Sequence, residues 1–82
     1  MSLARVIRAY SKTTELSLWE IRIETFSLCE FQAEFGVEDP HNPMYDCWPV
    51  RPENVPFLER YITNKNGWNF ELADYFVEAD AS

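Results

Sequence analysis

The fold of this chain is decided by residues 16–36, LSLWEIRIETFSLCEFQAEFG, in which the spacing of the apolar residues changes half-way. In residues 16–26, apolar and polar residues alternate, and Trp19, Ile21 and Ile23 fall on one side. Strict alternation is the pattern of a half-buried β-strand. After residue 26 the apolar spacing becomes helical. The stretch therefore predicts a strand that leads directly into a helix.

The segment that follows carries signals for both ends of that helix. Ser27 and Glu30 have the spacing of a capping box, in which each side chain receives a backbone N–H of the other residue. Gly36 suits the left-handed position that ends a helix. The residues that share the apolar stripe are Leu28, Phe31 and Phe35.

The flanking segments complete a small sheet. Residues 4–10 are rich in β-formers, and the polar turn 11–14 joins them to the strand at 16–26, which predicts a hairpin. A final strand is expected over residues 68–79, with a bulge or bend at 73–74.

Between these strands the chain is less regular. A short strand is expected at residues 45–48, and residues 52–62 predict a second helix. Because a proline disfavours helical geometry in the residue before it, Pro56 predicts that the regular helix begins near Pro56 rather than at Val55.

The order of elements is therefore ββα(β)αβ. It predicts an α+β fold with two layers, in which two helices cover one face of an antiparallel sheet of three to four strands. With 82 residues, we expect a single domain over 1–82.

Charge is segregated along the chain, whose formal net charge is −7. Residues 23–50 contain no Lys or Arg, but they contain Glu24, Glu30, Glu34, Glu38, Asp39 and Asp46. The three Trp, four Tyr and six Phe argue against disorder. They also exceed what a small core readily covers, so we expect some exposed rings at an interface.

Catalytic and metal chemistry find little support in the sequence. His41 and Cys47 match neither a zinc motif nor a nucleophile with a positioned base, so we expect a solvated histidine and a buried structural thiol. No two of the fourteen carboxylates have a spacing that singles them out as an acid–base pair. We therefore expect no enzyme activity, no catalytic residue, no metal and no cofactor.

Two other function classes are also disfavoured. An acidic chain with two glycines lacks both the basic footprint of a nucleic-acid binder and a glycine-rich phosphate loop. No segment has the length of a membrane span, and the start lacks a signal-peptide pattern. We expect a cytoplasmic protein in which Cys29 and Cys47 are reduced and unpaired.

Several segments carry a resemblance. The stretches DP at 39–40, PMYDCWPV at 43–50 and DYFVE at 74–78, with Phe57, Leu58 and Tyr61, resemble a group of small bacterial proteins of unassigned function. These proteins share a D-P-M-Y-D-C-[YW]-P-like segment, which His41-Asn42 interrupts here. In size and acidity the chain is also loosely similar to immunity proteins that neutralise basic nuclease toxins, and that likeness identifies no residue.

These features favour a protein-binding module. The more specific hypothesis is an immunity or antitoxin-like inhibitor. Its acidic residues would enter the basic groove of a partner, and opposite charge would speed the encounter. A structural or homo-oligomeric protein remains the alternative. The residues expected to bind the partner are Glu30, Glu34, Glu38, Asp39, Tyr45 and Trp48.

Overall fold

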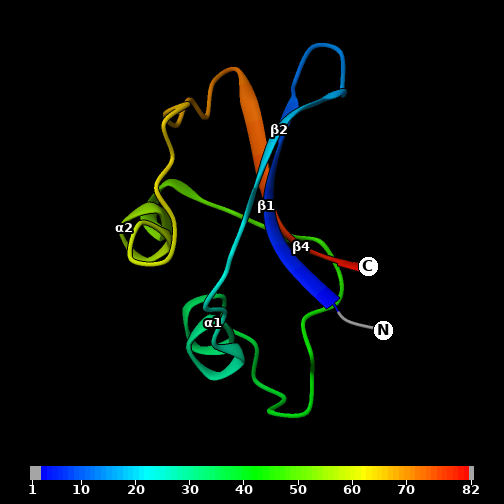
Figure 1. Cartoon of the computed structure of the whole chain (residues 1–82), viewed down its shortest axis with the longest axis vertical. Coiled ribbons are helices and arrows are strands. Elements are labelled where there is room, and N and C mark those ends of the chain that lie inside the picture. Colours follow the sequence, from blue (N-terminus) through cyan, green and yellow to red (C-terminus); the bar gives the residue numbers. More distant parts are fainter. Residues whose placement is uncertain (1–2, 82) are drawn as a thin grey trace.

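The computed structural model describes residues 3–81 and has one antiparallel sheet with two short helices (Figure 1). The strands follow the order β2-β1-β4-β3 across the sheet. This α+β architecture confirms the predicted fold class. The elements are β1 (Leu3–Ser11), β2 (Ser17–Arg22), α1 (Leu28–Glu34), β3 (Trp48–Pro49), the 3₁₀ turn η1 (Pro52–Asn54), α2 (Val55–Leu58) and β4 (Ala73–Ala81).

The first and last strands form the centre of the sheet. Ile7 of β1 pairs with Ile21 of β2 on one side and with Val77 of β4 on the other. Because side chains alternate between the two faces of a sheet, these three apolar residues point to one face. Both helices lie on that side (Figure 1), and Phe31 of α1 and Leu58 of α2 are fully buried there.

Helix α1 begins and ends as the sequence predicts, but of the two bonds of the expected capping box only the one accepted by Ser27 is present among the described residues. The Ser27 hydroxyl accepts a long hydrogen bond from the Glu30 N–H at 3.5 Å. At the other end Gly36 has φ +70°, and the Val37 N–H donates to the Gln32 carbonyl at 2.8 Å, which closes a Schellman motif. The Glu30 carboxylate lies 3.5 Å from Arg60 Nη2.

The second helix differs from the prediction at both ends, because α2 also stops at Leu58 and residues 59–61 form turns instead of continuing the expected helix to residue 62. Val55 has helical dihedral angles (φ −57°, ψ −47°) although Pro56 follows it, so α2 begins one residue earlier than expected. Pro56 stands in the first turn of α2, where its missing N–H has no helical acceptor to lose. The expected irregular turn before this helix is η1.

The last strand begins later than predicted, and the bulge or bend expected at 73–74 does not form, because Ala73 and Asp74 pair in register with Ser11 and Tyr10 of β1. Residues 68–72 form turns, and β4 starts at Ala73. The cause is Asn69, whose side-chain oxygen accepts from the N–H groups of Glu71 and Leu72, while its carbonyl accepts from Ala73. These local bonds compete with strand pairing. The short strand expected at 45–48 lies slightly later, at Trp48–Pro49, and pairs with β4.

Aromatic rings fill the core in two groups. Phe31 contacts four rings at the α1 and α2 side, and Tyr75 is the centre of the other group. Among the aromatic residues of the described part of the chain, Tyr45 alone is exposed. The expected surplus of exposed rings is thus reduced to one residue, because the helices are short and rings fill the space beneath them.

Candidate functional site

The segment between α1 and β3, residues 37–47, is named here the acidic loop. Glu38, Asp39 and Asp46 are all exposed on it. Within residues 3–81, no Lys or Arg side chain forms an ion pair with any of these three carboxylates. The acidic loop therefore carries a concentrated negative charge that the rest of the described chain leaves unpaired.

The acidic loop is held to the fold by side chains from outside it. Gln32 of α1 is buried, and its amide donates to the carbonyls of Pro40 at 3.2 Å and Asn42 at 2.7 Å. Arg5 of β1 donates to the carbonyls of Pro43 at 2.8 Å and Met44 at 3.3 Å. Four carbonyls of an irregular segment thus receive donors from two regular elements.

Met44 fixes the centre of the acidic loop. Its side chain is fully buried in the core, and its backbone has φ +55°, a conformation that side chains with a Cβ seldom adopt. The Met44 N–H donates to Asn42 Oδ1 at 2.9 Å, which stabilises this turn. A strained, anchored backbone of this kind presents the residues beside it in a defined geometry.

Tyr45 is the exposed aromatic of the acidic loop. The Arg5 guanidinium carbon lies 5.2 Å from the Tyr45 ring centroid and 4.3 Å from that of Phe26. Burial beneath these rings lowers the pKa of Arg5. Tyr45 is 57% exposed, so it remains accessible to solvent despite this contact.

Two of the expected binding residues are engaged within the fold. Glu30 is exposed but lies beside Arg60, as described above. Glu34 accepts a hydrogen bond at 2.8 Å from the amide of Asn54, which is almost fully buried. Arg60 and Asn54 follow α1 by 20 residues or more. These contacts could therefore not be predicted from residues close to α1 in the sequence. Reversing the charge of Glu34 would leave the Asn54 amide without its acceptor.

Trp48 belongs to the core rather than to an exposed surface. Its ring packs against the core cluster, and its Nε1 is buried without a hydrogen-bond partner among the described residues. Cys47, the preceding residue, is exposed, so the expectation of a buried thiol is wrong. The two side chains diverge because successive residues in extended backbone point to opposite faces.

The helix-free face of the sheet holds a charged network that sequence reasoning missed. Arg8 pairs with Glu20 at 3.0 Å and with Glu78 and Asp80 at 2.5 Å each. Its hydrogen bonds, that to Asp80 above all, raise the pKa of Arg8. The Tyr10 hydroxyl donates to Glu78 at 2.7 Å. In the sequence, the acidic residues at alternate positions over 74–80 indicate a charged face on this strand. They do not indicate that Arg8 lies beside them, because that depends on the register between β1 and β4.

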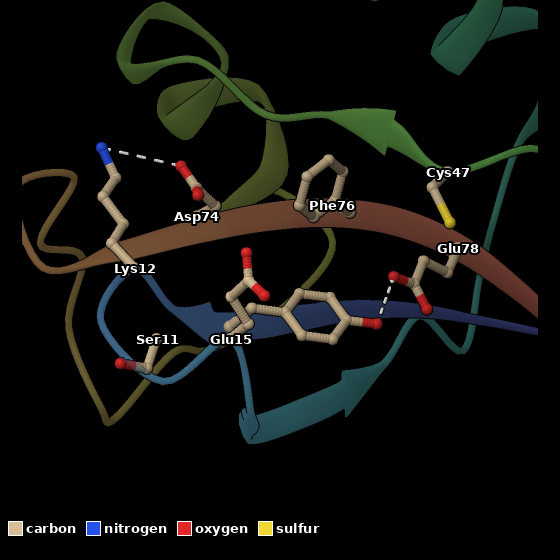
Figure 2. Close-up of a pocket in the computed structure, with 8 residues that line it drawn as sticks. Ser11, Lys12, Glu15, Cys47, Asp74, Phe76 and Glu78 are labelled. Atoms are coloured by element: carbon tan, nitrogen blue, oxygen red, sulfur yellow. Dashed lines mark hydrogen bonds and ion pairs between the residues drawn. The ribbon is translucent and has the colours of Figure 1, made fainter.

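Tyr10 and Glu78 also contribute to a pocket of about 370 Å³ on this face (Figure 2). Phe76 and Asp74 lie beside Glu78 along β4, and Cys47 directs its sulfur toward Glu78. Removal from water, and then the Glu78 charge, raise the pKa of the Cys47 thiol. The pocket is lined by Tyr10, Ser11, Lys12, Glu15, Cys47, Asp74, Phe76 and Glu78.

Residues 3–81 contain neither a cluster of metal-binding side chains nor a helix that could span a membrane. This part of the chain contains no group of three or more His, Cys, Asp or Glu side chains that would hold a metal ion. It also has no helix with the length and apolar composition that a membrane crossing needs. His41 is exposed, and its backbone N–H donates to Asp39 Oδ1 within the acidic loop at 2.9 Å.

The fold and its surfaces define a small α+β domain with an anchored acidic loop. The chain belongs to the family described as Domain of unknown function (DUF7683), whose model matches residues 4–78. The matched segment includes the acidic loop and the strands of the pocket. Comparison with curated proteins and with solved structures gave no match.

Proposed function

We propose that this protein is a binding module whose acidic loop docks onto a basic surface of a partner protein. The observation that carries this proposal is the combination of unpaired carboxylates and rigid anchoring in one segment. Glu38, Asp39 and Asp46 supply the charge, and Tyr45 supplies an exposed ring. A more specific version of this proposal is that the protein is an immunity or antitoxin-like inhibitor that masks the basic groove of a toxin.

Anchoring favours binding because a preformed loop loses little conformational freedom when the partner arrives. The bonds from Gln32 and Arg5, with the buried side chain of Met44, hold the acidic loop before any partner is present. The charge acts earlier, since opposite potentials accelerate the diffusional encounter of two proteins.

The expected division of labour follows from exposure. Glu38 and Asp46, which form no side-chain bond in residues 3–81, control the association rate and its dependence on salt. Tyr45 is the candidate anchor, and truncation of a buried interface aromatic reduces binding by roughly 2 kcal/mol or more. Glu30, Glu34 and Trp48 contribute to the fold beside this surface.

The test is capture of partners from a lysate of the source cell at low salt. The bait is the wild-type protein or a Glu38→Lys, Asp46→Lys double variant. The control is Glu59→Lys, Glu71→Lys, which changes the net charge by the same amount at two exposed residues outside the acidic loop. Quantitative mass spectrometry compares the captured proteins.

We expect basic proteins that bind the wild type and the control but not the acidic-loop variant. All three baits must keep the same circular dichroism spectrum. Equal capture by all three would mean that the acidic loop is a solvated surface only, and the proposal would then be abandoned.

A homo-oligomeric, structural role is the second candidate, and a different surface favours it. The outer edge of β2 has no partner strand among the described residues, and three exposed leucines lie at the same end of the sheet. They are Leu16, Leu18 and Leu72. Light scattering over a range of protein concentrations tests this role. A molar mass that stays monomeric at high concentration would rule out a homo-oligomer.

A further inference from the structure

The pocket on the helix-free face combines aromatic walls with an excess of carboxylates. The Tyr10 and Phe76 rings meet edge to face, with centroids 5.8 Å apart. Glu15, Asp74 and Glu78 line the pocket together with one base, Lys12. An aromatic face attracts a cation through its quadrupole, and carboxylates do so through their charge. The aromatic rings and the carboxylates of the pocket therefore both favour a positively charged ligand.

The carboxylates of the pocket are not equivalent. Lys12 Nζ lies 3.6 Å from the Asp74 carboxylate. Glu78 forms an ion pair with Arg8 and accepts a hydrogen bond from the Tyr10 hydroxyl. The Glu15 side chain has no hydrogen bond or ion pair within residues 3–81. Figure 2 shows its carboxylate directed to the side of the hairpin on which Asp74 and Phe76 lie. Glu15 is thus the unneutralised charge at the pocket.

The hairpin turn holds the Glu15 backbone in one defined conformation. Glu15 has φ +63°, a left-handed conformation that glycine and asparagine adopt at lower cost than glutamate. The hairpin turn holds it there, because the Glu15 N–H donates to the Ser11 carbonyl at 2.8 Å and the Ser11 hydroxyl accepts from Thr13 and Thr14.

We propose that this pocket binds an alkylammonium or guanidinium group, with the cation between the Glu15 carboxylate and the Tyr10 and Phe76 rings. The volume of about 370 Å³ suits one such side chain or a small amine. The pocket lies on the face opposite to the helices and uses none of the acidic-loop residues that carry the proposed function. It therefore remains testable if the acidic loop binds nothing.

The experiment is an NMR titration of the full chain with capped amino acids. N-acetyl-arginine amide and N-acetyl-lysine amide carry the proposed cation, and N-acetyl-norleucine amide has a similar stem without charge. We expect saturable shifts of the Tyr10, Glu15 and Phe76 amides with the two cations, at a dissociation constant of about 1 mM. Equal shifts with norleucine, or no saturable shift, would overturn the proposal.

Two variants test the two walls of the pocket. Glu15→Asn removes the charge at a position where asparagine suits the backbone, so its urea midpoint should equal or exceed that of the wild type while cation binding weakens several-fold. Phe76→Leu keeps an apolar wall without the ring and should weaken binding roughly two- to thirty-fold. Glu59→Gln, an equal charge change on an exposed residue of the other layer, should leave binding unchanged.

Unchanged binding in folded Glu15→Asn and Phe76→Leu would place the cation elsewhere and reject the site. The source of the cation is separated by comparing butylamine with a short extended peptide that contains one Arg. A tenfold preference for the peptide identifies a protein side chain as the ligand, and a preference for butylamine identifies a free amine.

Discussion

Glu78 illustrates how a single carboxylate is accommodated in a sheet surface. Only 8% of its side chain is exposed, and an isolated buried charge is strongly unfavourable. Arg8 supplies the opposite charge and Tyr10 supplies a hydroxyl, so both carboxylate oxygens have donors. The same bond, with burial, raises the pKa of Tyr10 above its ordinary value of 10.0.

The Tyr10 shift gives a prediction for alkaline pH. A pKa raised by folding means that the neutral phenol stabilises the fold, fully below pH 10.0 and progressively less as pH rises through the folded-state pKa. Tyr10→Phe should lower the free energy of unfolding by about 1 kcal/mol at pH 8, through loss of the hydrogen bond to Glu78. That difference should shrink by pH 11.

Urea unfolding of both proteins from pH 8 to pH 11 measures this difference. Burial also raises the pKa of Tyr61, but this group is present in both proteins, so its effect cancels in the comparison. A constant difference across this pH range would show that the Tyr10 phenol does not titrate against Glu78.

The two thiols should differ in reactivity. Cys29 and Cys47 are both exposed, and no disulfide joins them in the described part of the chain. The raised pKa of Cys47 lowers the fraction of reactive thiolate at neutral pH, so Cys47 should react more slowly than Cys29. The rates with an aromatic disulfide reagent are measured on Cys29→Ser and Cys47→Ser. Faster reaction at Cys47 would contradict this account.

At the scale of elements, α1 depends on tertiary contacts because it has only seven residues. Isolated helices of this length are unstable in water. Phe31 supplies the main contact, with ring centroids 4.5 Å from Phe26 and 4.9 Å from both Phe57 and Tyr61. One side chain thus joins α1 to the segment before it and to α2.

Phe31→Ala should therefore lower the free energy of unfolding by about 3–5 kcal/mol. This is a large part of the roughly 5–15 kcal/mol that stabilises a typical domain. The urea midpoint measures the change, with Ala33→Ser on the exposed side of α1 as the control. An unchanged midpoint in Phe31→Ala would mean that the apolar stripe does not face the core.

At the scale of the whole molecule, stability should be highest at the centre of the sheet. β1 is paired on both sides, whereas β2 is an edge strand and β3 has two residues. Amides that exchange only through global unfolding lie in such central elements. Hydrogen exchange should be slowest in β1 and β4 and faster in β2. Equal protection of β2 would indicate that its outer edge is covered, as a homo-oligomer requires.

The sequence by itself determined the element types, because periodicity and capping are local properties. The alternation over 16–26 and the signals at Ser27 and Gly36 specify a strand and a helix, although β2 ends at Arg22, four residues before the predicted end of the strand. The fold class followed from the order of these elements. The errors at Val55 and residues 68–72 arose where a proline was tolerated in a first turn and an asparagine side chain replaced strand bonds.

Tertiary structure alone decided which charges remain free. Residues 23–50 contain no Lys or Arg, yet Arg60 reaches Glu30 and Asn54 reaches Glu34. Conversely, Glu38 and Asp46 form no ion pair within residues 3–81, and strand register brings Arg8 and Glu78 together from opposite ends of the chain. Ion pairs depend on distances of a few ångströms in space, which the spacing of residues along the chain does not specify.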